Sequence, residues 1–267
     1  MPFSSACVRS AVSVLICAGI LSAPASVARS EQTAPEPTEE VVAETVVPVV
    51  ANVIGLGEVE WRTQLFLRND TGSEVDVAVT MPGVPGPFYF TTLPAGGSAA
   101  LNDLVHDTFG ITGAIDQLLI RTSGRYPVTA IATIYGVHEG SVVGTQQIPA
   151  LAQPPFGSLR LLSNLILSDT YRTNVGLVNY SDNTITFSMA LQRIAGRDVA
   201  TTMVTIPAHS VRQLPIQMLF PLIAEGGTFS IVADASSPLS YAYASVLNNE
   251  TIDARFVGGA LTFYHPF

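Results

Sequence analysis

Hydrophobic and polar residues alternate over short stretches along most of the chain. In the stretch Trp61–Arg68, every second side chain, including those of Leu65 and Leu67, falls on one face of an extended backbone. The same period of two recurs in residues 75–81, 118–120, 128–135 and 241–246. Gly, Pro, Asn or Asp interrupts these stretches about every 8–12 residues, which is typical of an antiparallel β-sandwich.

Two segments depart from this alternation and occupy matching places in the two halves of the chain. They are Leu101–Phe109 and Leu214–Leu222. Both are short, so we expect helical crossovers between the sheets of a sandwich.

The chain contains a long internal repeat. Trp61–Thr63 (Trp-Arg-Thr) returns as Tyr171–Thr173 (Tyr-Arg-Thr), 110 positions later. Further matches follow at spacings of 110 to 113, a drift that loop insertions between fixed strands produce. We therefore expect two copies of one domain, at residues 47–153 and 157–265, joined by the stiff segment Gln153–Gly157.

Each copy has about 100 residues, the usual size of an immunoglobulin-like domain. The sequence thus predicts an all-β fold of two tandem immunoglobulin-like antiparallel β-sandwiches, with about seven or eight strands in each. Asn69–Ser73 and Asn179–Asn183 are equivalent turns, and we expect each to close a hairpin.

Several motifs carry a resemblance to a known family. They are Asn52–Asn69, Leu93–Gly96, Pro127–Val128 and Gln147–Ala150. Together they resemble a family of secreted bacterial repeats, and the resemblance spans nearly all of residues 47–265. The second copy departs from the pattern, with Tyr171 in place of the Trp and His209 where a turn Gly is usual. The resemblance implies immunoglobulin-like sandwiches in exported proteins, often in tandem, and it brings no established chemistry.

The first 28 residues have the layout of a secretory signal peptide. Arg9 precedes an apolar run, Ala11–Ala23, and small residues follow at Ser26 and Ala28, which places cleavage after Ala28. The apolar run is shorter than the ~20 residues that span a bilayer, although an uncleaved N-terminal anchor is the alternative. Both cysteines lie before the cleavage site, so thiolate catalysis, disulfides and cysteine-ligated metals are excluded for the mature chain.

Residues 29–46 are acidic and rich in Pro, Ala and Thr, so we expect a disordered acidic linker there. The whole chain has a net charge of −9 and contains no lysine. This composition argues against nucleic-acid partners and against electrostatic docking to anionic lipid. Stable membrane insertion is not expected either.

The repeated arginines, Arg62 and Arg172, are candidate binding residues. A guanidinium group in each copy would suit an acidic or sugar ligand. The alternative is structural, with each arginine tying its strand to a neighbouring carbonyl or carboxylate.

An aromatic triplet is the second candidate. Phe88, Tyr89 and Phe90 follow residues 82–87, a Pro/Gly loop found in this form only in the first copy. Exposed aromatics on a rigid loop can stack on sugars or anchor a partner protein. The alternative is that they fill the end of the sandwich.

The sequence shows no motif for catalysis or for a cofactor. The spacings of zinc hydrolases and of serine hydrolases are both missing. Asp103, Asp107 and Asp116 could gather around the first crossover and bind calcium, but they lack the spacing of a dedicated calcium loop. We therefore expect no metal and no cofactor.

These observations favour a non-catalytic, exported interaction or structural module of the bacterial cell envelope or exterior. Its partner would be a protein or a glycan. Two alternatives stay open: a carbohydrate-binding protein that uses the loop aromatics or the arginine pair, and an enzyme with a site at the domain interface.

Overall fold

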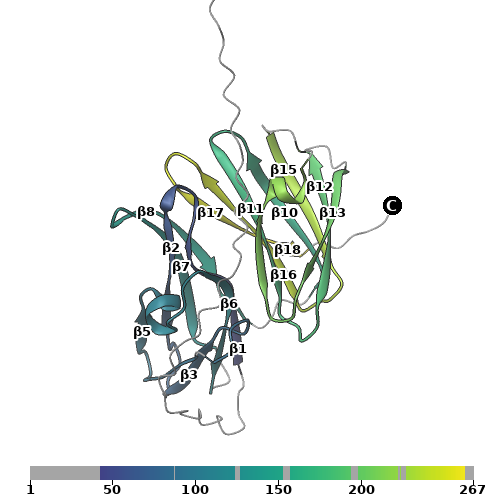
Figure 1. Ribbon diagram of the computed structural model, residues 1–267. Helices are drawn as coiled ribbons and strands as arrows, with labels where there is room; N and C mark the ends of the chain where they lie inside the picture. The colour runs from purple at the N-terminus through teal and green to yellow at the C-terminus, as the bar shows by residue number, and fades with distance from the viewer. Residues whose placement is uncertain are drawn as a thin grey trace, which may run out of the picture. The chain divides into compact units, whose positions relative to one another are not determined.

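The alternating stretches form the strands drawn in Figure 1. Their inward side chains build two hydrophobic cores. The computed structural model describes residues 43–86, 88–123, 127–152, 157–193, 198–221, 223 and 227–261, and these belong to one compact unit. Neighbouring strands pair in antiparallel fashion throughout the described chain. The predicted all-β sandwich class is confirmed.

The first repeat contains nine described strands. They are β1 (Ala43–Ile54), β2 (Glu60–Arg68), β3 (Val75–Thr80), β4 (Phe88–Leu93), β5 (Ser98–Leu101), β6 (Ala114–Thr122), β7 (Thr129–His138), β8 (Ser141–Pro149) and β9 (Leu151–Ala152). One layer has the order β4-β3-β6-β1-β9, and the other contains β5, β2, β7 and β8. Strand β1 belongs to both layers, because it pairs with β6 over most of its length and with β2 at Val53 and Ile54.

The second repeat reproduces this order in two separate sheets. Its strands are β10 (Leu159–Leu167), β11 (Tyr171–Asn179), β12 (Ile185–Arg193), β13 (Asp198–Ile206), β14 (Val211–Pro215), β15 (Gly227–Ala235), β16 (Ser240–Asn248), β17 (Ala254–Gly258) and β18 (Ala260–Leu261). The sheet β13-β12-β15-β10-β18 corresponds to β4-β3-β6-β1-β9, and the sheet β14-β11-β16-β17 corresponds to β5-β2-β7-β8. Each repeat therefore has nine described strands, one more than the upper end of the predicted seven or eight, and the last of each nine, β9 and β18, has only two residues.

A buried asparagine organises the same arch in each repeat. Asn69 is fully buried, and its Nδ2 donates to the carbonyl oxygens of Ser73, Leu93 and Pro94 at 2.8–3.0 Å. Its Oδ1 accepts from the backbone N and the hydroxyl of Thr71 at 2.9 and 2.7 Å. One side chain therefore satisfies the polar groups of two loops, which a buried arch requires.

Asn179 repeats this arrangement atom for atom. Its Nδ2 donates to the carbonyl oxygens of Asn183, Ile206 and Pro207, and its Oδ1 accepts from the backbone N and the hydroxyl of Ser181. The prediction that these turns close hairpins is wrong, because β2 and β3, like β11 and β12, lie in different layers. The asparagine instead fixes a connection between layers.

The N-terminal boundary of the first repeat lies earlier than predicted. Residues 43–46, expected at the end of the disordered linker, form the start of β1 and pair with β6 from Ala43↔Thr122 onward. Ala43, Thr45 and Val46 are buried there, so the apolar alternation has already begun. The signal peptide predicted for residues 1–28, linker residues 29–42 and most of the Gln153–Gly157 joint lie outside the described residues.

The two predicted crossover helices are present only as single turns. A π-helical turn, η2 (Leu104–Thr108), follows β5, and a short α-helix, α1 (Ile216–Leu219), follows β14. The first residues of both predicted helices are in strands, since Leu101 pairs with Leu65 and Leu214 pairs with Val175. Within the described residues, no helix is both long and apolar enough to span a membrane.

The two repeats pack directly against each other. Tyr243, Tyr241 and Val178 of the second repeat belong to the buried cluster of the first. Gly176 permits this packing, because a Cβ at this position would lie within 2.5 Å of the Tyr243 ring, which covers the glycine and stacks on Phe256. The sheet β14-β11-β16-β17 therefore has two buried faces, one of them turned to its own core.

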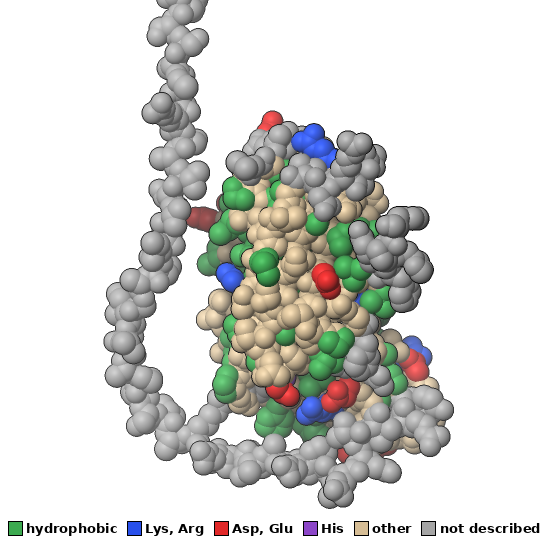
Figure 2. Space-filling view, turned by 90° about the vertical axis from the view of Figure 1, so that its right-hand side faces the viewer, with side chains coloured by type: hydrophobic (Ala, Val, Ile, Leu, Met, Phe, Trp, Pro, Cys, Tyr) green, Lys and Arg blue, Asp and Glu red, His purple; other side chains and the backbone are tan. Residues whose placement is uncertain are grey.

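Uncharged side chains dominate the surface. On the face drawn in Figure 2, hydrophobic and other uncharged groups predominate and charged groups are few, in line with 33 charged Lys, Arg, Asp and Glu residues in 267. Any cluster of charged side chains is therefore unusual in this molecule.

Candidate functional site

Arg62 lies on β2 at the centre of an ion-pair cluster. Its Nη2 contacts Glu60 Oε2 at 2.5 Å, and its Nη1 contacts Asp103 Oδ2 at 3.3 Å. The hydrogen bond to Glu60 raises the pKa of Arg62, and the Asp103 carboxylate adds to this. The structural interpretation of Arg62, a tie to neighbouring carboxylates, thus has direct support.

The turn after β5 supplies the acidic side of the cluster. Asp103 has a left-handed backbone, with φ 43° and ψ 54°, and only 4% of it is exposed. Asn52 Nδ2 donates to its Oδ1 at 3.2 Å. The next two residues, Leu104 and Val105, are fully buried. These apolar anchors fix the turn against the core, so His106 and Asp107 project to the surface.

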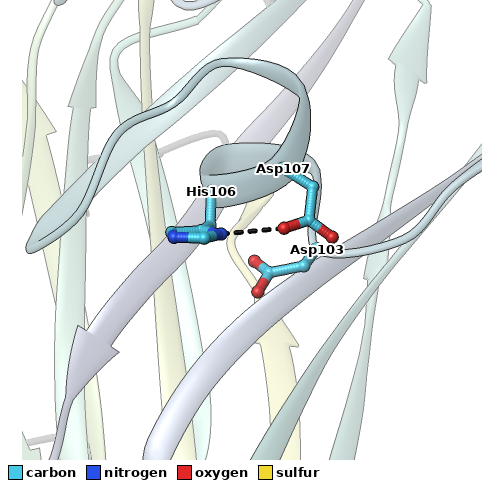
Figure 3. Close-up of side chains that lie close together, drawn as sticks. All are labelled: Asp103, His106 and Asp107. Atoms are coloured by element: carbon cyan, nitrogen blue, oxygen red, sulfur yellow. Dashed lines mark hydrogen bonds and ion pairs between the residues drawn. The ribbon is translucent and has the colours of Figure 1, made fainter.

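His106 and Asp107 complete a group of three ligand-type side chains (Figure 3). His106 Nδ1 lies 2.8 Å from Asp107 Oδ1, and the ligand atoms of Asp103, His106 and Asp107 all lie within 4.8 Å of one another. Two carboxylates and an imidazole can accept hydrogen bonds from hydroxyl groups, and they can also serve as ligands to a divalent cation. The Asp103 carboxylate already binds Arg62 and Asn52, so His106 and Asp107 are more available to bind a ligand.

These side chains line a cleft of about 630 Å³, which we call the Trp61 cleft. Trp61 and Asn52 contribute to its wall, and Thr112 and Gly113 close another side. Three carboxylates, those of Glu60, Asp103 and Asp107, face one arginine there. The excess of negative charge suits a neutral polyhydroxyl ligand or a cation and disfavours an anion.

The second arginine of the repeated motif lies in a different cleft. Arg172, half-buried on β11, lines a cavity of about 510 Å³ between the repeats, which we call the inter-repeat cleft. Its Nη1 donates to Asn249 Oδ1 at 2.6 Å, and burial lowers its pKa. Although Trp61 lines both clefts, Arg62 lines only the first and Arg172 only the second. The structure therefore does not bring the two arginines into one site.

The aromatic triplet lies away from both clefts. Phe88, Tyr89 and Phe90 begin β4 at the end of a sheet, so the prediction that they sit on a loop is wrong. Tyr89 packs against the first core, as the alternative interpretation had it. Phe88 and Phe90 alternate with it and point outward, with 45% and 51% of their surfaces exposed.

Asp116 does not join the other two acids of the suggested calcium site. It is 3% exposed, and its carboxylate accepts from the backbone N of Gly83 and of Gln117 at 3.1 and 2.8 Å. Burial raises its pKa to about 6, against the pull of these hydrogen bonds and of His209. The three aspartates therefore do not gather, and Asp103 and Asp107 lie with His106 instead.

The sequence contained a signal for the missed members of this group. Asp103, His106 and Asp107 are spaced i, i+3, i+4, which places side chains on one face of any helical turn. No second histidine lies three or four residues from His106, so its spacing does not single it out as a ligand. Trp61 stands out in the sequence only as a marker of the repeat.

The polar cluster belongs to the first repeat alone. The corresponding segment of the second repeat, Leu214–Ile223, contains no acid and no histidine. Ile216 and Leu219 of α1, and Phe220 after it, are buried instead. In the second repeat, the fold therefore forms this crossover with apolar side chains in its interior and without charged groups.

Comparisons with known proteins find little. No family model and no curated protein matches the chain. Among solved structures, the Thermotoga maritima protein 1070 has 13% identity and a TM-score of 0.36, over 40% of this chain and 96% of that one. The β-glucuronidase 2 of Bacteroides uniformis, bound covalently to a cyclophellitol-6-carboxylate aziridine, has 13% identity and a TM-score of 0.16, over 73% of this chain and 24% of that one. At such values neither match adds to the fold described above.

Proposed function

We propose that the protein is a non-catalytic binding module of the bacterial cell envelope or exterior, and that the Trp61 cleft holds its ligand. The observation that carries this proposal is the difference between the two crossovers. Both crossovers are single turns that bury apolar residues, but only the first carries acids and a histidine, Asp103, His106 and Asp107, beside a cleft. Stability does not require the polar version, so a ligand is its simplest reason.

A carbohydrate is the ligand class that fits this cleft. Carboxylates and an imidazole accept hydrogen bonds from hydroxyl groups, and the Arg62 guanidinium donates to ring or hydroxyl oxygens. The half-buried indole of Trp61 offers an apolar surface for a sugar ring. An acidic glycan is disfavoured, because it would meet the excess negative charge.

The test is a glycan array on the purified protein, followed by titration of each bound glycan. Trp61 is the only tryptophan in the chain and lines both clefts, so its fluorescence follows binding at either one, and the substitutions assign the cleft. We expect Asp107→Asn and His106→Ala to weaken binding by about tenfold, the usual worth of one hydrogen bond to a charged group. Both side chains are more than half exposed, so folding should be unaffected.

The second repeat provides a matched control. His209 Nε2 and Asp182 Oδ1 form an equivalent exposed pair at 2.7 Å, far from the Trp61 cleft in sequence and not lining it. Asp182→Asn should leave glycan binding unchanged. Equal loss in Asp107→Asn and Asp182→Asn would refute the site, and turnover of a bound glycan that Asp107→Asn abolishes would refute the non-catalytic role.

A protein partner at the edge of β4 is the second candidate function. The exposed Phe88 and Phe90 alternate along a strand that ends its sheet in the described chain. An extended partner strand could pair with β4 and cover both rings. Crosslinking in native cells should capture an envelope protein that Phe88→Ser/Phe90→Ser loses and Met203→Ser, an exposed residue of edge strand β13, retains. Capture that survives the double substitution would exclude this surface.

A further inference from the structure

The inter-repeat cleft is lined by strands from both repeats. Strand β8 contributes Gln146, β11 contributes Arg172 and Asn174, and β16 contributes Tyr243 and Ser245. The cleft exists because the outer face of the second repeat's sheet packs on the first repeat only in part. Its volume of about 510 Å³ is within the range of small-molecule sites, which are frequent at domain interfaces.

One residue that lines this cleft has a buried hydrogen-bond donor without a partner in the described chain. Gln146 is 7% exposed, and its Oε1 accepts from the Ser245 hydroxyl at 3.1 Å. Its Nε2 makes no hydrogen bond within the described chain. Leaving a buried amide donor unpaired costs about 1–3 kcal/mol, so an acceptor is expected to meet it.

An arginine without a carboxylate faces the same cleft. None of the ion pairs in the described residues includes Arg172, and its Nη1 donates to the neutral amide of Asn249. No acidic residue lines the cleft. The residues that line the cleft therefore contribute one positive charge, on the half-buried Arg172, and one unpaired amide donor, on Gln146.

The remaining wall is largely apolar. Val53, Ile54, Ile115 and Leu247 line it, together with one side of Trp61. An occupant must therefore combine an acceptor-rich anionic end with an apolar body. We infer that the inter-repeat cleft binds a small monocarboxylate, whose carboxylate pairs with Arg172 and accepts from Gln146 Nε2 while its hydrocarbon part contacts the apolar wall.

A monoanion fits better than a dianion or a sugar. One arginine neutralises one negative charge, and a phosphate monoester would keep a second charge in a partly buried site. A sugar would place hydroxyl groups against the apolar wall without partners. This inference does not rest on the proposed glycan site, which has the opposite charge.

The test uses benzoate, phenylacetate and hexanoate as probes on the purified full-length protein, with the corresponding amides as neutral controls. Binding is followed by calorimetry and by the fluorescence of Trp61, which lines the cleft. We expect at least one acid to bind about tenfold or more tightly than its amide, the worth of a charge-assisted bidentate pair. Equal affinity for acid and amide, or no binding by any acid, would overturn the inference.

Arg172→Gln locates the site. It should reduce carboxylate affinity by about tenfold or more, whereas the matched control Arg212→Gln should not change it. Arg212 is exposed on β14 and does not line the cleft. Circular dichroism and thermal melts verify folding of each variant, and Arg172→Met replaces Arg172→Gln if the latter does not fold. Binding that survives the loss of Arg172 would contradict the assignment.

Gln146→Leu distinguishes a ligand site from a packing defect. Removal of the unpaired donor should raise the thermal midpoint of the free protein while lowering carboxylate affinity several-fold. A raised midpoint with unchanged affinity would mean that Gln146 has no part in binding and would remove one of the two supports. Glycan binding measured on the same variants should be unaffected, which separates this inference from the proposed function.

Discussion

Two connections show what the repeats share and where they differ. The connection after β2 resembles the one after β11, whereas the connection after β5 differs from the one after β14. At the first, Asn69 and Asn179 make the same five hydrogen bonds in both repeats. At the second, a polar π-helical turn in one repeat stands against an apolar α-helical turn in the other. Duplicated contacts report what the fold needs, and a contact present once reports something beyond folding.

The duplicated asparagines should give the largest effect. Asn69→Ala and Asn179→Ala each leave several buried carbonyl and N–H groups unpaired, and each should lower the free energy of unfolding by about 4 kcal/mol. Urea denaturation of both variants measures this. A large difference between the two losses would break the equivalence of the two arches.

The buried acid of the first repeat, Asp116, predicts a pH dependence of stability. Burial raises the pKa of Asp116 from 3.8 to about 6, so its contribution to stability is complete below pH 3.8 and is lost as the pH rises through 6. The loss should amount to about 2–3 kcal/mol between pH 3.5 and 7.

Denaturation at several pH values checks this dependence. Asp116→Asn should flatten the profile over that interval. Asp234 is the acid of β15, the strand that corresponds to β6, and it is exposed. Asp234→Asn should therefore retain the wild-type profile. A profile that is unchanged in Asp116→Asn would assign the dependence to another group.

The repeated arginines should differ although their motif is the same. Arg62→Gln leaves the buried carboxylate of Asp103 with Asn52 but without its counter-charge, and should lower stability by about 2 kcal/mol. Arg172→Gln deprives no carboxylate of a partner and should cost less than about 1 kcal/mol. Parallel denaturation curves compare them, and equal losses would show that the motif acts in the same way in both repeats.

The substitution of Gly176, which lies under the Tyr243 ring, should have a smaller effect than the loss of Arg62. Gly176→Ala places a methyl group against the ring, which must shift, and should cost about 1–2 kcal/mol. Gly72→Ala is the control, because open space surrounds that position. A thermal midpoint as high in Gly176→Ala as in Gly72→Ala would show that the ring moves freely.

Local patterns of the sequence predicted the strands well. The alternation around Trp61 and Tyr171 survives as β2 and β11 because each strand buries one face in a core, and that requirement can be read from neighbouring residues. The aromatic triplet was misjudged for a related reason. Pro and Gly before Phe88 indicated a loop, yet β-forming residues 88–93 pair with β3 as soon as the loop ends.

The clefts depended on information that no local pattern holds. Asp103 meets Arg62 only because its left-handed backbone redirects the chain after β5. Aspartate tolerates that conformation, but the presence of an aspartate in a sequence does not predict it. Gln146 and Arg172 share a cavity because two domains pack face to face. Spacing along the chain does not encode how one sandwich docks on another.

The tyrosines that cross from the second repeat into the first core bear on how the protein becomes folded. Tyr241 and Tyr243 belong to the buried cluster of the first repeat, so that core is incomplete without the second repeat, which also has a core of its own. If the chain were cut near residue 155, the fragment with the second repeat would expose the sheet face that carries these tyrosines to water and would be prone to aggregate. The cooperative unit of folding is thus the pair, and we expect one melting transition where the duplicated sequence suggests two.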